Sequence, residues 1–217
     1  MNMIFKKFWW MTMGVYALML YILVFYVSIY SSSAHASETG RQILTLEMTP
    51  AMCLLYPSRA QMRQCQEGYR MTVSSLDLGY DCLSSTTPVL SPVQEKVVRR
   101  IMPDDTFLRQ AWRRHGACSP LSASEYFRLV TRYTSELKLP EEIASGDRYY
   151  VDKAMLQQKF RRLNPRLRIG QINFICQPVQ QRSILTKIQI CYTDGQGNCS
   201  NTVDTCPDRL TIWGNNG

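Results

Sequence analysis

The stretch FLRQAWRRHGAC, residues 107–118, contains one of the two histidines in the chain and ends on a cysteine. His115 follows two arginines, Arg113 and Arg114, so a group that titrates near neutral pH stands beside two fixed positive charges. The other histidine, His35, lies in SSSAHAS near the N-terminus. Any chemistry that needs two imidazoles therefore depends on whether residue 35 stays with the rest of the chain.

The N-terminus carries a membrane-targeting signal. Residues 8–30 are a run of 23 positions without a charge, and Lys6 and Lys7 precede it. Lysines before such a run hold the N-terminus in the cytoplasm, so we expect the remainder of the chain to be translocated.

Two interpretations of this segment stay open. Ala34-His35-Ala36 fits the cleavage site of a signal peptide, whereas the apolar run is long enough to span a bilayer as a retained signal anchor. We expect a signal peptide or anchor over 1–36 and one exported domain over 37–217. The domain is then periplasmic or otherwise extracytoplasmic, and a retained run 8–30 tethers it to the inner membrane.

Cysteine usage agrees with export. All eight cysteines lie in the translocated part, and an even number in an oxidising compartment indicates a disulfide framework. A zinc site is the alternative, but no Cys-x-x-Cys pair occurs and the exported part has hardly any histidine to complete a metal shell. The sequence therefore predicts no metal and no other cofactor. Spacing alone does not fix how eight cysteines pair.

The exported part is basic, with about six more basic than acidic residues once Lys6 and Lys7 are removed. The positive charges cluster at Arg99-Arg100, at Arg109, at Arg113-Arg114 and in KFRRLNPRLR, residues 159–168. Such a surface suits a polyanion such as nucleic acid, lipopolysaccharide or anionic lipid. A solvated basic face on two helices, without a ligand, is the alternative.

Hydrophobic periodicity and capping signals predict a mixed fold. Alternation favours strands over 41–48, ending at Pro50, and over 69–78, and two further strands near the C-terminus over 168–176 and 184–193. Capping residues favour helices over 91–102, 122–138 (with Ser122 or Ser124 as the cap) and 152–163. We expect one α+β domain in which helices pack on an antiparallel sheet.

Several segments of the sequence resemble the signature segments of a known family. HGAC at 115–118, with Trp112 three positions earlier, resembles the second signature of the ribonuclease T2 family, H-E-W-x-K-H-G-T/A-C. MTVSSLDL, 71–78, stands where the first signature, F-T-I-H-G-L-W-P, belongs, and LTLEMTPAMC, 44–53, is similar to the family's first core strand. NFICQPV and ILTKIQICYT resemble its closing strands, so the resemblance covers nearly the whole exported domain.

The resemblance implies a ribonuclease T2-like fold held together by disulfides. It pairs Cys53 with Cys65, Cys82 with Cys118, Cys176 with Cys206 and Cys191 with Cys199. The family's bacterial members are exported endoribonucleases that need no metal. In them the ribose 2′-hydroxyl attacks its own phosphate and leaves a 2′,3′-cyclic phosphate.

That reaction needs a base for the 2′-proton, an acid for the leaving 5′-oxygen and cationic donors for the phosphorane, and histidines suit both proton transfers. Here Ser74 replaces the histidine of the first signature. In the second, Gln110 replaces the first histidine, Ala111 the glutamate and Arg114 the lysine. The site therefore keeps anion-binding character while it loses its proton machinery.

The interpretation of the remaining site residues stays open. His115 is either the residual catalytic group or a structural histidine beside the Cys118 bridge. Arg114, Arg113, Gln110 and Trp112 are candidates to bind phosphate or RNA, and Trp112 is equally interpretable as a core residue.

Three functions follow. The first is a catalytically degenerate domain that serves as a binding or structural module, as part of a membrane-associated envelope complex. The second is a slow endoribonuclease with His115 as the acid and Asp77 or solvent as the base. The third is an RNA or polyanion binder that does not cleave, with Arg113, Arg114 and residues 159–168 as its basic face.

Overall fold

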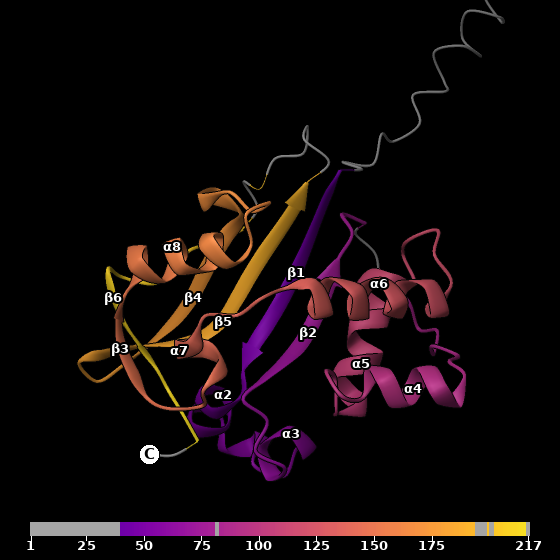
Figure 1. Ribbon diagram of the computed structural model, residues 1–217. Helices are drawn as coiled ribbons and strands as arrows, with labels where there is room; N and C mark the ends of the chain where they lie inside the picture. The colour runs from indigo at the N-terminus through magenta and orange to yellow at the C-terminus, as the bar shows by residue number, and fades with distance from the viewer. Residues whose placement is uncertain (1–39, 81–82, 194–198, 200–201, 216–217) are drawn as a thin grey trace, which may run out of the picture. The chain divides into compact units, whose positions relative to one another are not determined.

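The strand expected over 41–48 is the centre of the fold (Figure 1). In the computed structural model, which describes residues 40–80, 83–193, 199 and 202–215, β1 (Arg41–Met48) lies between β2 (Met71–Asp77) and β5 (Arg182–Thr193) and pairs antiparallel with both. Leu44 and Leu46 enter the main core as the alternation predicts. The polar residues Thr45 and Glu47, which alternate with these leucines, are buried as well, because β1 has a neighbouring strand on each edge.

Within the described residues the sheet has six strands. β4 (Ile172–Val179) pairs with β5, and two short strands, β6 (Arg209–Ile212) and β3 (Tyr149–Asp152), extend the order to β2-β1-β5-β6-β3. The pairings are antiparallel, as predicted, except that β5 meets β6 in parallel at Ile184 and Thr211.

The helices follow the capping signals with small differences. Ser91 caps α4 (Pro92–Val98) in a capping box with Gln94. The helix ends before residue 102, because the backbone forms hydrogen-bonded turns from Arg99 onward. Ser122, and not Ser124, caps α6 (Ala123–Glu136) through a second capping box. α8 (Lys153–Leu163) matches the helix expected over 152–163.

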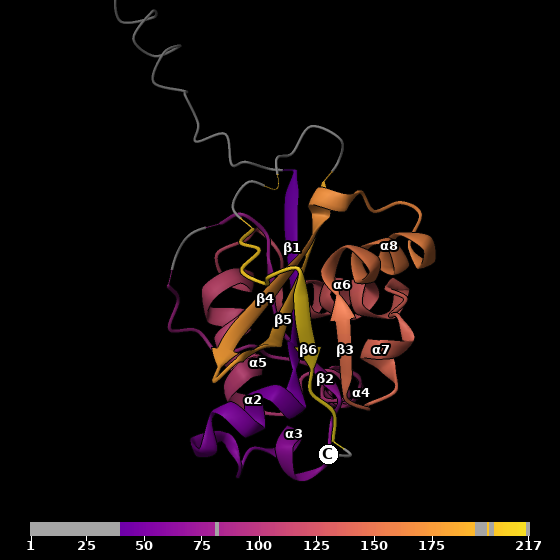
Figure 2. The same cartoon turned by 90° about the vertical axis from the view of Figure 1, so that its left-hand side faces the viewer.

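Other elements had no sequence prediction. Pro50 opens α2 (Thr49–Leu55) instead of a loop, because proline fits the first turn of a helix. The remaining elements are α3 (Arg63–Gln66), α5 (Asp105–Ala111), a π-helix (Trp112–Gly116), α7 (Glu141–Ala144) and 3-10 turns at Pro57–Arg59 and Ile169–Gln171. Figures 1 and 2 show α4, α5 and α6 gathered beside β1 and β2, and α7 and α8 beside β3.

One hydrophobic core joins these two groups of helices. On α6, Tyr126, Phe127 and Val130 are buried and Tyr133 is partly exposed, and Leu137 is buried just beyond the helix end. On the other side Phe160 of α8 packs near Phe174 of β4, with ring centroids 5.9 Å apart.

Disulfides fix the chain segments that lie outside the sheet ladder. The structure confirms three predicted bridges: Cys53–Cys65, Cys176–Cys206 and Cys191–Cys199. The fourth prediction, Cys82–Cys118, includes Cys82, which lies outside the described residues.

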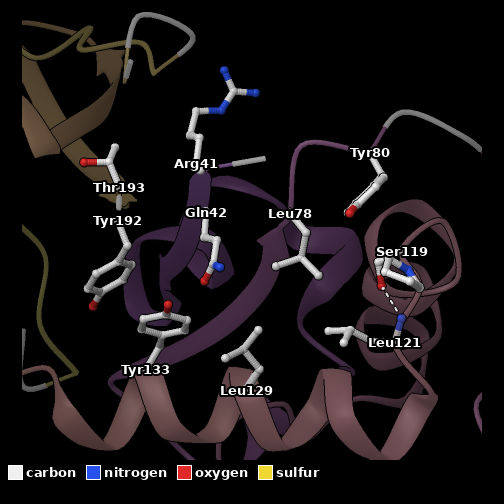
Figure 3. A pocket seen from close by; sticks show the side chains of 12 residues that line it. Arg41, Gln42, Leu78, Tyr80, Ser119, Leu121, Leu129, Tyr133, Tyr192 and Thr193 are labelled. Carbon is white, nitrogen blue, oxygen red and sulfur yellow. Dashed lines mark hydrogen bonds between the residues drawn. The ribbon is translucent and has the colours of Figure 1, made fainter. Parts of the chain in front are cut away.

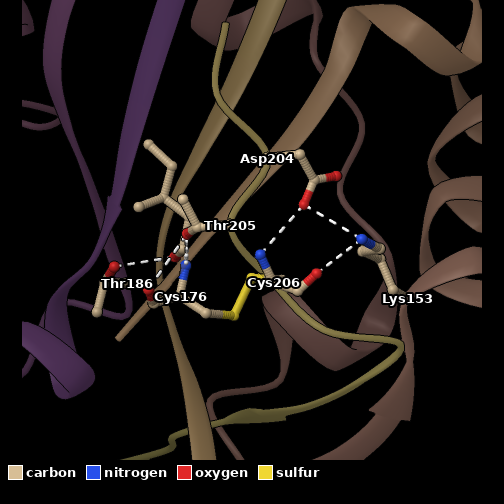
Figure 4. The surroundings of a disulfide bond; sticks show 7 residues. Lys153, Cys176, Thr186, Asp204, Thr205 and Cys206 are labelled. Carbon is tan, nitrogen blue, oxygen red and sulfur yellow. Dashed lines mark hydrogen bonds and ion pairs between the residues drawn. A yellow bond between two sulfur atoms is a disulfide. The ribbon is translucent and has the colours of Figure 1, made fainter. Parts of the chain in front are cut away.

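Around the Cys176–Cys206 bridge, Lys153 donates a hydrogen bond to the Cys206 carbonyl (2.7 Å), and the Cys176 backbone N–H donates to the Thr205 hydroxyl (2.9 Å), as Figure 4 shows. The segment before β6 is thereby held against both β4 and the start of α8.

The chain divides into two units, Met1–Ser37 and Glu38–Gly217. The first lies outside the described residues. In the second, the core, the sheet and the three bridges are all internal, so this unit has what it needs to fold by itself. Among the residues described, no helix has the length and apolar character to cross a membrane.

Candidate functional site

A bulge in β2 shapes the first half of the site. Ser75 lies opposite Thr45 and Val73 lies opposite Leu46, so Ser74 is an extra residue without a partner on β1. The bulge lets Val73 and Leu76 both enter the core although they are three residues apart. The Ser74 hydroxyl donates a hydrogen bond to the Thr45 carbonyl over 3.3 Å. Its hydroxyl is therefore engaged by the neighbouring strand.

The second half is the π-helix Trp112–Gly116, a geometry that recurs at functional sites. Trp112 is only 8% exposed; its ring lies against Tyr126 and Phe127, and its indole N–H donates to the Thr86 hydroxyl (3.1 Å). A Cβ on Gly116 would lie 2.8 Å from a ring atom of Tyr126 and closer still to Trp112, so only glycine fits. This burial favours the core interpretation of Trp112.

One hydroxyl joins the two halves. The Tyr126 hydroxyl accepts a hydrogen bond from the Leu76 N–H (3.3 Å) and lies 2.9 Å from the Leu76 carbonyl and 3.4 Å from the Ala111 carbonyl. Burial raises the pKa of this tyrosine, so the group stays protonated and can donate. The two segments that resemble the family signatures therefore lie side by side.

Their juxtaposition brings His115 to Asp77. The imidazole Nδ1 lies 3.6 Å from the Asp77 Oδ1, and the two side chains are 22% and 31% exposed. Asp77 also accepts a hydrogen bond from the Gly79 N–H (2.8 Å). The contact with His115 is the main cause that holds the pKa of the Asp77 carboxyl below its usual range; partial burial opposes it, and the Gly79 N–H adds to it. Asp77 is thus a carboxylate at neutral pH.

The other predicted site residues differ in how far they are exposed. Gln110, Arg113 and Arg114 are exposed, and among the described residues neither arginine makes an ion pair. Ala111 is 2% exposed, so the position that matches the family's glutamate faces the core. The arrangement can hold an anion, and it presents one imidazole.

A hollow that the sequence did not indicate lies beyond the end of β2. Its volume is about 440 Å³, and Tyr133 of α6 and Tyr192 of β5 stack in its wall with centroids 4.3 Å apart. Gln42 points toward Tyr133, whereas Arg41 points away from the hollow (Figure 3). The further lining includes Leu78, Tyr80 and Leu129. These residues come from separate segments, so no local pattern could have revealed the hollow.

Within the described ranges no group of three or more His, Cys, Asp or Glu side chains is placed to hold an ion. The carboxylate of Asp77 and the imidazole of His115 therefore act as a pair, not as part of a larger ligand set, as far as the described residues extend.

The fold is similar to that of several solved plant proteins. A variant of ribonuclease MC1, an enzyme from bitter gourd seeds, in complex with 5′-UMP is 15% identical with a TM-score of 0.60 and covers 79% of this chain and 97% of its own. The Japanese pear S3-RNase is 15% identical (TM-score 0.57; 80% and 98% covered). An RNase-related protein from Calystegia sepium is 17% identical (TM-score 0.57; 79% and 96% covered).

No family model and no curated protein sequence matches the chain. At these identities the likeness shows the fold alone, and it confirms the predicted α+β architecture. The chain has the fold of the ribonuclease T2 family.

Proposed function

We propose that the exported part is a ribonuclease T2-fold domain that has lost normal RNA cleavage and serves as a binding or structural module in the cell envelope. One observation carries the proposal: His115 is the single imidazole of residues 37–217, and the position that matches the first signature's histidine holds Ser74, whose hydroxyl bonds to the backbone of β1.

The chemistry explains why this loss matters. Proton transfer from the 2′-hydroxyl and to the leaving 5′-oxygen needs two groups that exchange protons near neutral pH, and a serine hydroxyl has no useful proton affinity there. Loss of one general acid or base lowers a rate by about 10² to 10⁴-fold. Asp77 does not replace it well, because a carboxylate with a lowered pKa is a weaker base. What remains at the site is one imidazole beside exposed arginines.

The contact between His115 and Asp77 supports a second candidate, a slow endoribonuclease. A carboxylate beside Nδ1 orients the imidazole. His115 would then protonate the leaving 5′-oxygen through Nε2 while solvent takes the 2′-proton, and the product would carry a 2′,3′-cyclic phosphate. Arg114 would stabilise the phosphorane.

RNA or another polyanion remains a proposed ligand in either case. The ribonuclease MC1 variant was solved with a nucleotide, 5′-UMP. In this chain the exposed Arg113 and Arg114 support phosphate binding beside His115, without a requirement for cleavage.

One assay separates the first two candidates. Oxidised residues 38–217 and a matched His115→Ala variant are incubated with an end-labelled RNA in the presence of a chelator, free of host nuclease. The degenerate module is expected to give no cleavage above the variant. Cleavage that leaves a cyclic phosphate and disappears in the variant would sink that proposal and establish the slow nuclease.

The envelope location is a separate part of the proposal. It is supported by the uncharged run 8–30 and by the disulfide framework. Detection of the uncleaved chain in the membrane fraction is the expected result, whereas a soluble product that begins near residue 37 would show that the segment is removed.

A further inference from the structure

Four arginines at the end of α8 and in the loop after it form a positively charged patch outside the site. We call Arg161, Arg162, Arg166 and Arg168 the α8 arginine cluster. All four side chains are exposed, and none makes an ion pair with another described residue. Lys159 is not included, because Glu142 pairs with it.

The backbone beneath the cluster is held in place. The Asn164 side chain accepts a hydrogen bond from the Lys138 N–H (2.9 Å) and donates to the carbonyls of Lys138 and Phe160 (both 2.8 Å). Leu167, between the last two arginines, is only 6% exposed and packs into the core. The four charges are therefore presented on a surface whose backbone is fixed, and not on a free loop.

The cluster lies at the end of the domain where the chain arrives from its N-terminal segment. The Arg168 N–H donates to the Gln171 side chain (2.7 Å), which in turn donates to the Thr193 hydroxyl (3.5 Å). Thr193 is the register partner of Arg41, the first residue of β1. Figures 1 and 2 show the loop after α8 beside the end of β5 and near the start of β1.

The sequence limits how far this end can be from the apolar run. Residues 31–39 alone separate the run 8–30 from Gly40. At about 3.3 Å per extended residue they reach roughly 30 Å. A retained run therefore keeps Gly40 no farther than roughly 30 Å from the end of the run.

We propose that the α8 arginine cluster rests on the anionic phospholipid headgroups of the membrane that residues 8–30 span. This inference rests on the exported, tethered domain proposed above. The negative potential of an anionic surface attracts arginine side chains. Leu163 lies among these arginines, is 38% exposed and can enter the interface.

Lipid fits the patch better than single-stranded nucleic acid does. Proteins that bind single strands stack bases on exposed aromatic rings. The one aromatic residue within 159–168, Phe160, is fully buried, and the exposed Tyr150 belongs to β3. The cluster thus offers charge and one aliphatic side chain without a stacking platform.

Vesicles test the proposal. Residues 38–217, which hold a complete core, are sedimented with vesicles of phosphatidylcholine alone or mixed with phosphatidylglycerol. We expect binding to the mixed vesicles only, weakened by added salt. A variant with all four cluster arginines changed to glutamine should bind roughly 100-fold more weakly.

The matched control removes four exposed charges elsewhere: Lys96→Gln, Arg100→Gln, Arg109→Gln and Arg128→Gln. It should bind nearly as tightly as the unchanged domain, and thermal unfolding checks that both variants are folded. An equal loss in the two variants would overturn the proposal, because only net charge would then matter.

Absence of binding to the mixed vesicles, with salt-sensitive binding of single-stranded RNA that the cluster variant loses, would overturn it in favour of nucleic acid. None of these outcomes bears on the RNA-cleavage assay, which uses His115, so failure of the lipid surface and failure of the proposed loss of catalysis are distinguishable.

Discussion

The two faces of the π-helix Trp112–Gly116 differ sharply. The inward face is packed so closely that Gly116 has no room for a Cβ, and Trp112 and Tyr126 fill the space around it. The outward face carries His115 and the exposed Arg113 and Arg114, where much of the family's signature is missing. Within these five positions, the residues that build the fold are therefore separate from the exposed residues at the site.

We expect the largest change in the free energy of unfolding from a substitution on the inward face. In Gly116→Ala the new methyl group must displace the Trp112 or Tyr126 ring, both held by the core, so we expect a loss of about 3 kcal/mol in the free energy of unfolding. Chemical denaturation measures it. Gly170→Ala is the matched control, because a Cβ there meets no atom within 4 Å. Equal stability of the two variants would show that the inward face is loosely packed.

The segments beside the outward face, β2 and α5, should accept changes that restore chemistry. Ser74→His with Gln110→His returns both missing histidines to segments that the Tyr126 hydroxyl holds side by side. We expect metal-independent RNA cleavage at least about 100-fold above the unchanged domain, since each acid or base contributes on that order. The product should carry a cyclic phosphate.

The control for this gain places the same number of histidines one position away, at Ser75 and Arg109. It should remain inactive. Equal activity in the two double variants would mean that any added imidazole suffices. No activity in the restored variant, with the fold intact, would mean that the outward face has lost its geometry as well as its histidines.

Strands with enough residues to alternate were predictable from the sequence. β1, β2 and β5 fall where the pattern of apolar residues places them, and Ser91 and Ser122 mark the starts of α4 and α6. β3 and β6, with four residues each, are too short to show a period. They form because tertiary pairing supplies what local sequence does not.

The site was less predictable than the fold. Trp112 and His115 were identifiable from their segment, and Asp77 was predicted as a possible base. The contact of Asp77 with His115 was not predictable, because it depends on the β2 bulge and the π-helix. Neither feature has a reliable sequence signal. The hollow lined by Gln42, Tyr133 and Tyr192 likewise arises only when separate segments meet.

We expect the smallest change in the free energy of unfolding at the contact between Asp77 and His115. Because its pKa is lowered in the folded state, the Asp77 carboxylate stabilises the fold above its unfolded pKa of about 4, and this contribution disappears as the pH falls through the folded value. Asp77→Asn should therefore lower the free energy of unfolding at pH 7 by about 0.5 kcal/mol, since the pair is partly solvated. The difference should vanish in strong acid.

Chemical denaturation at a series of pH values measures this, with Asp208→Asn, an exposed carboxylate, as the matched control that should show no such dependence. A constant difference across the series would mean that Asp77 acts through packing or through the Gly79 N–H and not through its charge. A difference that grows as the pH falls would mean that the charge of the Asp77 carboxylate does not stabilise the folded state. Either result would indicate that the contact between Asp77 and His115 serves the fold. His115 would then have a structural role, like Trp112 and Gly116.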